Sequence, residues 1–207
     1  MSDHGYHMGE HGHVGKRMND GLLTHIPLVM KIPGVDPKEI EEVVESIDIF
    51  PTLVEAASFD PMPFCNPTAE GSSGQADLCT EGKSLLTLFT DYGKFEWQNE
   101  AFSQELGTSN VKIFTKSTLF IFSDIGADKR SSSFTIRTQE WRYTEWIPFT
   151  ATSNLNRIYH WDRQPLAREL YNIGTDFFEE VNLAERSAYN RTMNYLSMRI
   201  KLRMKRQ

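Results

Sequence analysis

The hydrophobic residues in the C-terminal half of the chain follow two patterns, the first typical of strands and the second of a helix. Short runs rich in β-branched and aromatic residues alternate with turn residues, which predicts strands. These runs are Ala101–Gln104, Val111–Ser123, Ser133–Thr138, Trp141–Ile147 and Arg168–Tyr171. Only Gln139 and Glu140 separate the third run from the fourth, so we expect a hairpin between them.

Near the end of the chain the apolar residues have the spacing of a helix. Apolar residues recur three and four positions apart, which predicts a helix from about Ala184 to Met204. The residues of this stripe are Tyr189, Met193, Leu196, Ile200 and Met204. We interpret the stripe as a core contact rather than a cofactor site.

The N-terminal half has weaker patterns. The run Ile26–Ile32, closed by Pro33 and Gly34, predicts a buried strand that ends in a turn. Asp48 suits an N-cap with Pro51 in the first helical turn. One face of that helix is apolar, and we expect it to pack in the core; its residues are Phe50, Leu53, Val54 and Ala57.

Residues 35–45 allow two interpretations. Asp36 and Pro37 could begin a helix that runs through Glu39, or the segment could be a loop that leads to a strand at Val43 and Val44. Residues 1–20 and 58–78 are rich in glycine, proline and polar residues, which predicts loops.

Composition bounds the class of protein. The 207 residues allow one or two domains, and 39% hydrophobic with 24% charged residues is typical of a globular protein. The net charge of -6 argues against general nucleic-acid binding. We expect no membrane span, because no apolar run approaches the roughly 20 residues that a membrane helix needs.

Cys65 and Cys79 flank a polar, turn-rich loop. A disulfide between them would contribute about 3 kcal/mol in the chain-entropy model. The alternative is two separate thiols in a reducing compartment. Asn190, Arg191 and Thr192 form an N-glycosylation sequon, which is a weak indication of a secreted setting because such triplets also arise by chance.

The first sixteen residues carry the main chemical signal. Ser2-Asp3-His4-Gly5 and Gly9-Glu10-His11-Gly12 are followed by Lys16. The segment places a carboxylate, an imidazole and an ammonium among glycines that let backbone approach a ligand. Such a set suits a cation together with a tetrahedral oxyanion. A His-rich tag or metal tract is the alternative, but the regular spacing to Lys16 disfavours it.

The pattern Ser-Asp-His-Gly-x3-Gly-Glu-His-Gly-x3-Lys resembles the second metal-binding segment of the type I sulfatases. Other segments are similar to that family, and to its iduronate-2-sulfatase branch in particular: Thr24–Leu28, Ile49–Leu53, Cys79–Leu86, Ile136–Trp146 and Glu169–Leu183. In the family the metal segment lies past the middle of the polypeptide. The chain therefore looks like a C-terminal part that lacks the N-terminal half with the formylglycine motif.

The resemblance implies a fold. We expect residues 1–92 to be the remainder of an α/β, alkaline-phosphatase-like sulfatase domain. Residues 93–207 should form a C-terminal subdomain, a small antiparallel sheet with a packed C-terminal helix. Because the first part would lack its sheet partners, we expect it to expose apolar edges.

The resemblance also implies roles for single residues. Asp3 and His4 would contribute to one Ca²⁺ site, and Lys16 would contact the sulfate as a catalytic and substrate-binding residue. Tyr6 stands where the iduronate branch has a tryptophan, so it is expected near the substrate and leaves the sugar open. Lys129 is the candidate to hold a substrate carboxylate, with Arg130 as the alternative. Cys65 and Cys79 are the candidate disulfide pair.

The expected function is a sulfuric ester hydrolase that acts on a glycosaminoglycan-type sugar in the lysosome or outside the cell. The cysteine of a Cys-x-Pro-x-Arg motif provides the nucleophile in this family, but alanine follows at the arginine position after Cys65. We therefore expect this chain alone to be inactive and to need the N-terminal half. The alternatives are a catalytically dead sulfatase-like binding protein and a phosphoesterase of the same superfamily.

Overall fold

The computed structural model of the protein describes residues 1–16, 19–65, 78–90, 96–107, 112–115, 118–121, 130–151 and 157–204. The chain divides into two compact units: Met1–Leu28 with Phe102–Lys205, and Val29–Ala101. The expected domains met at residue 92, whereas here the first 28 residues join the C-terminal unit. The domain boundary in the intact family fold stays a prediction.

An antiparallel arrangement around β7 forms the first unit. Strand β7 (Trp141–Ala151) pairs with β6 (Arg130–Arg137) on one side, and on the other with β8 (Arg157–Tyr159) and β9 (Arg168–Asn172). Strand β3 (Ala101–Gly107) borders β6. The register pairs Arg137 with Arg142, so the predicted hairpin around Gln139 is confirmed.

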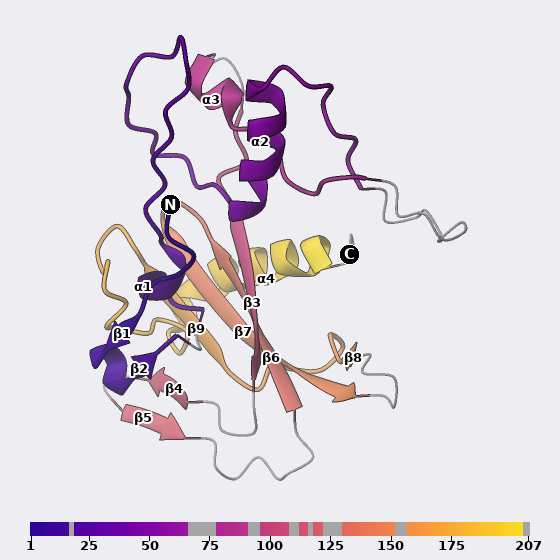
Figure 1. Ribbon diagram of the computed structural model, residues 1–207. Helices are drawn as coiled ribbons and strands as arrows, with labels where there is room; N and C mark the ends of the chain where they lie inside the picture. Colours follow the sequence, from indigo (N-terminus) through magenta and orange to yellow (C-terminus); the bar gives the residue numbers. More distant parts are fainter. Residues whose placement is uncertain are drawn as a thin grey trace. The chain divides into compact units, whose positions relative to one another are not determined.

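The C-terminal helix α4 (Asn190–Met204) covers one face of this sheet, after a short η3 (Ser187–Tyr189) (Figure 1). The predicted apolar stripe is confirmed as core, because its central residues Met193, Leu196 and Ile200 are buried. Tyr189 and Met204 pack at the edge of the same cluster. The sheet contributes Phe134, Ile136, Tyr143, Ile147 and Leu170. None of the helices in the described part of the chain is long and apolar enough to cross a membrane.

One strand prediction was wrong in form. Val111–Ser123 is not a single strand: it contains β4 (Lys112–Thr115) and β5 (Thr118–Ile121), which pair with each other in an antiparallel hairpin. Two polar residues, Lys116 and Ser117, interrupt the apolar run in the sequence. A short polar interruption between two β-prone runs is a hairpin signal, and the prediction overlooked it.

The N-terminal segment is mostly loop with short regular pieces. Strands β1 (His7–Met8) and β2 (Val14–Gly15) pair antiparallel, with η1 (Glu10–Gly12) between them. Helix α1 (Gly21–Thr24) follows, and the Asp20 side chain caps it by accepting a hydrogen bond from the Leu23 amide at 3.2 Å. This cap satisfies one of the amides that a helix start leaves without a partner.

The second unit is built around η2 (Ser46–Asp48), α2 (Ile49–Ala56) and α3 (Leu86–Thr90). Thr52 is fully buried; its hydroxyl donates to the Asp48 carbonyl at 2.6 Å and accepts from the Leu85 amide at 2.8 Å. The Asp48 carboxylate accepts from the amides of Glu45 and Lys83. These polar contacts hold the start of α2 against residues 80–85.

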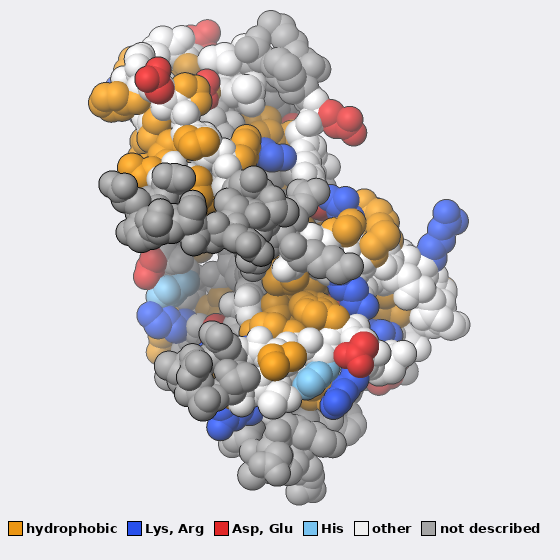
Figure 2. Space-filling view, turned by 90° about the vertical axis from the view of Figure 1, so that its right-hand side faces the viewer, with side chains coloured by type: hydrophobic (Ala, Val, Ile, Leu, Met, Phe, Trp, Pro, Cys, Tyr) orange, Lys and Arg blue, Asp and Glu red, His pale blue; other side chains and the backbone are white. Residues whose placement is uncertain are grey.

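Two predictions for the N-terminal half were wrong. No strand forms among the described residues 26–32, and Val29 is 86% exposed, because a short apolar run by itself does not decide between strand and loop. The α2 face with Phe50 and Leu53 is exposed rather than in the core; Pro51 and Thr52 are buried instead. Figure 2 shows hydrophobic side chains on the surface of the unit that contains α2 and α3.

The ambiguous segment 35–45 is a loop. The Val43 amide donates to the Asn99 side chain at 2.9 Å, and the Val43 carbonyl accepts from the Trp97 indole at 2.9 Å. Side chains thus satisfy this backbone, so it needs neither helix nor sheet partners.

Candidate functional site

Asp3, His4 and Lys16 converge at the surface of the first unit. The Nζ atom of Lys16 lies 2.8 Å from Nε2 of His4, and Asp3 Oδ2 lies 3.2 Å from the same nitrogen. The Asp3 side chain is 84% exposed, whereas that of His4 is about one third exposed. Twelve positions separate His4 from Lys16 in the sequence, so the β1–β2 hairpin that lies between them brings the two together.

Hydrogen bonding constrains the imidazole of His4. Its Nδ1 lies 2.7 Å from the Gly5 carbonyl oxygen, which can only accept, so Nδ1 carries a proton. In the neutral ring Nε2 then offers a lone pair, which can accept from the Lys16 ammonium. The same lone pair faces the Asp3 carboxylate. Two electron-pair donors that point at one position suit a cation between them.

The donor set fits only part of a calcium site. Ca²⁺ takes six to eight ligands, mostly oxygens. Asp3 provides one exposed carboxylate, and His4 provides a nitrogen that suits Ca²⁺ less well. Among the described residues no group of three or more His, Cys, Asp or Glu side chains could hold a metal ion. Asp3 and His4 can therefore add ligands to a site, but they need other oxygens to complete it.

The backbone around the site is fixed by close packing. The Gly5 amide donates to the Leu23 carbonyl at 2.9 Å, which ties the segment to α1. A Cβ atom at Gly5 would collide with the carbonyl oxygen of Leu22. Glycine next to His4 is therefore required by this approach of two backbones.

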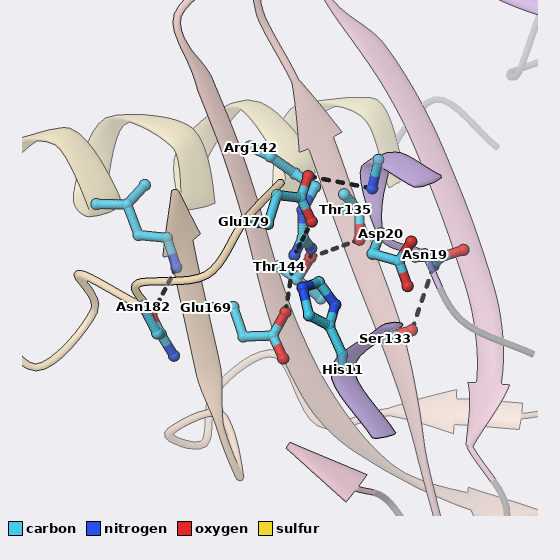
Figure 3. Close-up of polar contacts among 12 residues, drawn as sticks. His11, Asn19, Asp20, Ser133, Thr135, Arg142, Thr144, Glu169, Glu179 and Asn182 are labelled. Atoms are coloured by element: carbon cyan, nitrogen blue, oxygen red, sulfur yellow. Dashed lines mark hydrogen bonds and ion pairs between the residues drawn. The ribbon is translucent and has the colours of Figure 1, made fainter. Parts of the chain in front are cut away.

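Beneath the hairpin lies a buried polar layer that sequence reasoning did not find. His7 is 1% exposed, and its Nε2 lies 2.7 Å from Oδ2 of Asp20. The Asn19 amide group donates to the Ser133 hydroxyl of β6 at 3.2 Å. Ser133, Thr135 and Thr144 line this face of the sheet, as Figure 3 shows.

Arg142 of β7 is the centre of this layer. Its Nη2 lies 2.7 Å from Glu179 and 3.1 Å from Glu169, and its Nη1 donates to the Thr144 hydroxyl at 2.7 Å. Glu179 also accepts a hydrogen bond from the Gly21 amide at 3.1 Å. The strand is therefore buried on both faces: α4 covers one, and the N-terminal segment covers the other.

The charges of this layer perturb each other. Burial raises the pKa of Glu169 to about 7, although Arg142 acts in the opposite direction. Burial lowers the pKa of Arg142, but Glu179 and Glu169 outweigh it, so the net shift is upward and the guanidinium stays charged. One buried cation thus faces two carboxylates, and the second carboxylate is poorly compensated.

Two polar residues spaced two positions apart in β7, Arg142 and Thr144, were the signal that could have indicated this layer. Arg142 and Thr144 share one face of β7, and Tyr143 and Glu145 share the other. All four side chains are buried, so polar groups on both faces need hydrogen-bond partners inside the protein. The sequence alone does not show which segment supplies the carboxylates. Glu179 follows Phe177 and Phe178 in a loop, and nothing in that loop indicates a buried charge.

The other predicted site residues lie as follows. Tyr6 is 56% exposed and precedes β1 directly. Lys129 lies outside the described residues. Asn190 is exposed at the start of α4. Cys65 and Cys79 form a disulfide with a Cα–Cα distance of 4.9 Å, so that prediction is confirmed and neither side chain is a free thiol.

Comparison with known proteins gives the context of this geometry. The family model "Sulfatase" matches residues 1–59. Iduronate 2-sulfatase of Homo sapiens is 27% identical over 223 aligned residues, which cover 88% of this chain and 37% of the human protein. The chain thus spans little more than a third of the length of this curated relative.

Solved structures share the fold. A structure described as a 2-O GAG sulfatase aligns with a TM-score of 0.63 at 18% identity, over 99% of this chain and 35% of that one. The phosphonate monoester hydrolase of Agrobacterium radiobacter aligns with a TM-score of 0.63 at 19% identity, over 99% of this chain and 34% of that one. The predicted fold class, the C-terminal part of an alkaline-phosphatase-like fold with a small antiparallel sheet and a packed helix, is confirmed.

Proposed function

We propose, from the premise that this chain is a relative of the type I sulfatases in sequence and fold, that it supplies the lysine and part of the metal site of a sulfuric ester hydrolase. The observation that carries the proposal is the convergence of Asp3, His4 and Lys16. The family model covers all three residues, since it matches residues 1–59.

Each residue has a distinct task in this proposal. Lys16 is exposed and presents a point charge to a sulfate oxygen. Without bound Ca²⁺, the one lone pair on Nε2 of His4 accepts from Lys16 and so places the ammonium beside the site. When Ca²⁺ binds, that lone pair and the Asp3 carboxylate would serve as its ligands, and the ion would neutralise sulfate charge. The ammonium is already placed before the ester binds, which favours the charge that develops on the sulfate oxygens in the transition state.

The substrate class follows from the relatives. A sulfated sugar of the glycosaminoglycan type is proposed, because one relative is an iduronate 2-sulfatase and one fold neighbour is described as a 2-O GAG sulfatase. Tyr6, next to β1, and Lys129 are the proposed sugar contacts.

The chain by itself is proposed to be inactive. Its two cysteines are joined to each other, and neither is followed by a Pro-x-Arg sequence in the formylglycine spacing. The nucleophile and the remaining calcium ligands would come from the N-terminal half of an intact enzyme. Sulfatase activity of the purified 207-residue chain would contradict this part of the proposal.

Two other functions have support. The fold neighbours include phosphonate monoester hydrolases, so a phosphoesterase would use the same lysine on a similar oxyanion. A catalytically dead binding protein would retain Lys16 without turnover. Binding of phosphate more tightly than of sulfate would favour the first, and sulfate binding that the N-terminal half does not convert to turnover would favour the second.

Location is proposed from the same resemblance. The disulfide and the exposed sequon at Asn190 fit a lysosomal or secreted glycoprotein. Expression in secretory cells, followed by glycosidase treatment, should shift the mass of the wild type but not that of the Asn190→Gln variant. An unshifted wild type would contradict glycosylation at this residue.

Sulfate binding tests the main proposal. Titration of the full chain with inorganic sulfate, followed by NMR of the histidine rings, should show saturable binding that involves His4. Lys16→Ala should weaken it about tenfold or more, since it removes the cation. Lys31→Ala, an exposed lysine in the other unit, is the matched control and should bind like the wild type. Equal binding by all three proteins would overturn the role of Lys16.

A further inference from the structure

Asp20 binds two parts of the first unit with different oxygens of one carboxylate. Its Oδ2 lies 2.7 Å from Nε2 of His7 in β1, and its Oδ1 accepts from the Leu23 amide of α1 at 3.2 Å. Because a carboxylate oxygen accepts, Nε2 of His7 carries the proton and donates to Asp20. The two side chains are only 1% and 5% exposed. Water hardly competes for this hydrogen bond, which strengthens it.

The contact with His7 leads to Lys16. His7 is the cross-strand partner of Gly15 in the β1–β2 hairpin, and Lys16 follows Gly15 in the chain. Pairing between strands keeps His7 and Gly15 at a nearly fixed separation, so any shift of His7 also shifts the backbone next to Lys16. The hydrogen bond from His7 to Asp20 therefore limits where the ammonium of Lys16 can lie.

The contact with Leu23 leads to His4. The Leu23 carbonyl accepts from the Gly5 amide at 2.9 Å, and the Gly5 carbonyl oxygen lies 2.7 Å from Nδ1 of His4. Nζ of Lys16 lies 2.8 Å from Nε2 of His4, which closes the series of contacts. The series runs through His4, Gly5, Leu23, Asp20, His7, Gly15 and Lys16. In a closed series, the distance at one contact depends on all the others.

The backbone on both sides of Asp20 is fixed to the rest of the unit. Asn19 donates to the Ser133 hydroxyl of β6 at 3.2 Å, and the Gly21 amide donates to Glu179 at 3.1 Å (Figure 3). Asp20 is therefore a fixed point. A change at its carboxylate should move the hairpin or α1 rather than the backbone of Asp20 itself.

We propose that His7 and Asp20 are positioning residues that set the distance between His4 and Lys16. Both are buried beneath the surface that carries Lys16, and they act on it through the β1–β2 hairpin. Residues that support a binding group from behind commonly decide its affinity. The consequence for sulfate rests on the function proposed above, whereas the effect on the distance does not.

The ¹⁵N signals of the His4 ring report this distance in the full chain without any ligand. Lys16→Ala removes the contact at Nε2 of His4 and so gives the reference signal for its loss. Two variants break the hydrogen bond between His7 and Asp20 from either side. His7→Phe keeps a buried ring without Nε2, and Asp20→Ser keeps a helix cap that is too short to reach His7. In both, the His4 Nε2 signal should move most of the way to the reference.

Two further variants separate positioning from lost stability. Leu196→Ala leaves a cavity in the core under α4 and is the matched control, which should keep the wild-type His4 signal. The double variant of His7→Phe and Asp20→Ser should give the same His4 signal as either single variant, because it breaks the same contact. Urea unfolding identifies the variants that are folded.

Asp20→Asn tests for rescue. The side-chain carbonyl of asparagine can accept from the Leu23 amide, and its NH₂ group can donate to Nε2 of His7 if the imidazole proton moves to Nδ1. Within the described part of the chain Nδ1 of His7 has no hydrogen-bond partner, so no donor there opposes this change of tautomer. The two ¹⁵N signals of His7 should therefore exchange their protonated and unprotonated character, while the His4 signal stays close to that of the wild type.

Sulfate affinity tests the consequence for binding. His7→Phe and Asp20→Ser should weaken binding of inorganic sulfate about three- to tenfold, the size of effect expected of residues that act through others. Asp20→Asn should restore most of the affinity that Asp20→Ser loses. Leu196→Ala should bind like the wild type.

Each result decides one of the two proposals. A His4 signal that keeps its wild-type value in both His7→Phe and Asp20→Ser would overturn the inference, and so would an equal movement in Leu196→Ala. A moved His4 signal with unchanged sulfate affinity would overturn the positioning role in binding. Sulfate binding that Lys16→Ala leaves unchanged would overturn the proposed function, and the His4 signals would still decide whether His7 and Asp20 set the distance.

Discussion

The guanidinium of Arg142 lies 2.7 Å from the carboxylate of Glu179, and both side chains are buried. Arg142 belongs to β7, whereas Glu179 lies in the loop after β9 and also accepts from the Gly21 amide. One carboxylate therefore holds the central strand and the start of α1 together. Because the segment before α1 carries Asp3, His4 and Lys16, this ion pair helps to position the candidate site through the start of α1.

Glu179→Ala should destabilise the protein by about 1–3 kcal/mol, the cost of leaving a buried hydrogen-bonding group without its partner, because Arg142 keeps Glu169 as a counter-ion. It removes the 2.7 Å pair and leaves the Gly21 amide without its acceptor. Glu180→Ala, the exposed neighbour, is the matched control and should change stability by less than about 0.5 kcal/mol. Urea unfolding measures both, and equal midpoints for the two variants would contradict a structural role of the pair.

The sheet and its helix could be predicted from the sequence because the spacing of hydrophobic residues differs between strands and helices. The residues of the α4 stripe and the β6–β7 hairpin needed only local spacing, and both were correct. The exposed face of α2 shows the limit of this reasoning. Phe50 and Leu53 have helical spacing, but a period says which residues share a face and not what covers that face.

The candidate site could also be predicted only in part from the sequence. The order of Asp3, His4 and Lys16 could be recognised as a pattern along the chain. The carboxylates that meet Arg142 could not, because Glu169 and Glu179 come from segments far from it in sequence. Only the fold shows that residues 19–21 lie against β6 and against the loop that contains Glu179. Asn19 donates a hydrogen bond to Ser133 of β6, and the Gly21 amide donates one to Glu179.

Glu169 should make stability depend on pH. Its folded-state pKa is raised to about 7 by burial, against 4.5 for an ordinary glutamate. The folded protein therefore holds a proton that the unfolded chain releases above pH 4.5. The stability from this group is complete below about pH 4.5 and is lost as pH rises to about 7, with a total on the order of a few kcal/mol.

Glu169→Gln should remove that slope, because glutamine does not ionise and can still accept from Arg142. Urea unfolding at several pH values between 4.5 and 8 compares the variant with the wild type. Glu185→Gln, at an exposed position, is the control and should keep the wild-type slope. A parallel pH profile for Glu169→Gln would show that Glu169 is ionised throughout and that the slope has another source.

Helix α4 offers a matched pair of leucines. Leu196 is 1% exposed in the core, and Leu202 is 43% exposed. Leu196→Ala should cost about 2–5 kcal/mol, through lost burial and the cavity left behind. Leu202→Ala should cost less than about 1 kcal/mol, since the helix propensity of alanine is equal or better. Thermal or urea unfolding measures the difference, and similar losses for both would mean that α4 does not pack by the observed face.

The disulfide should stabilise the second unit. Cys65 and Cys79 are 14 positions apart, and the chain-entropy model gives about 3 kcal/mol for a loop of this size. The bond also reinforces the bridge between Phe64 and Thr80, where the Cys65 amide donates to the Thr80 carbonyl at 3.0 Å. In the Cys65→Ser and Cys79→Ser double variant, hydrogen exchange should therefore become faster over residues 45–56 and 78–90, which Asp48 and Thr52 connect.

Residues 130–151 of the first unit provide the internal control and should keep their protection. Dithiothreitol should reproduce the effect in the wild type and leave the double variant unchanged. Wild-type exchange that is insensitive to dithiothreitol would show that the bond contributes nothing to this unit.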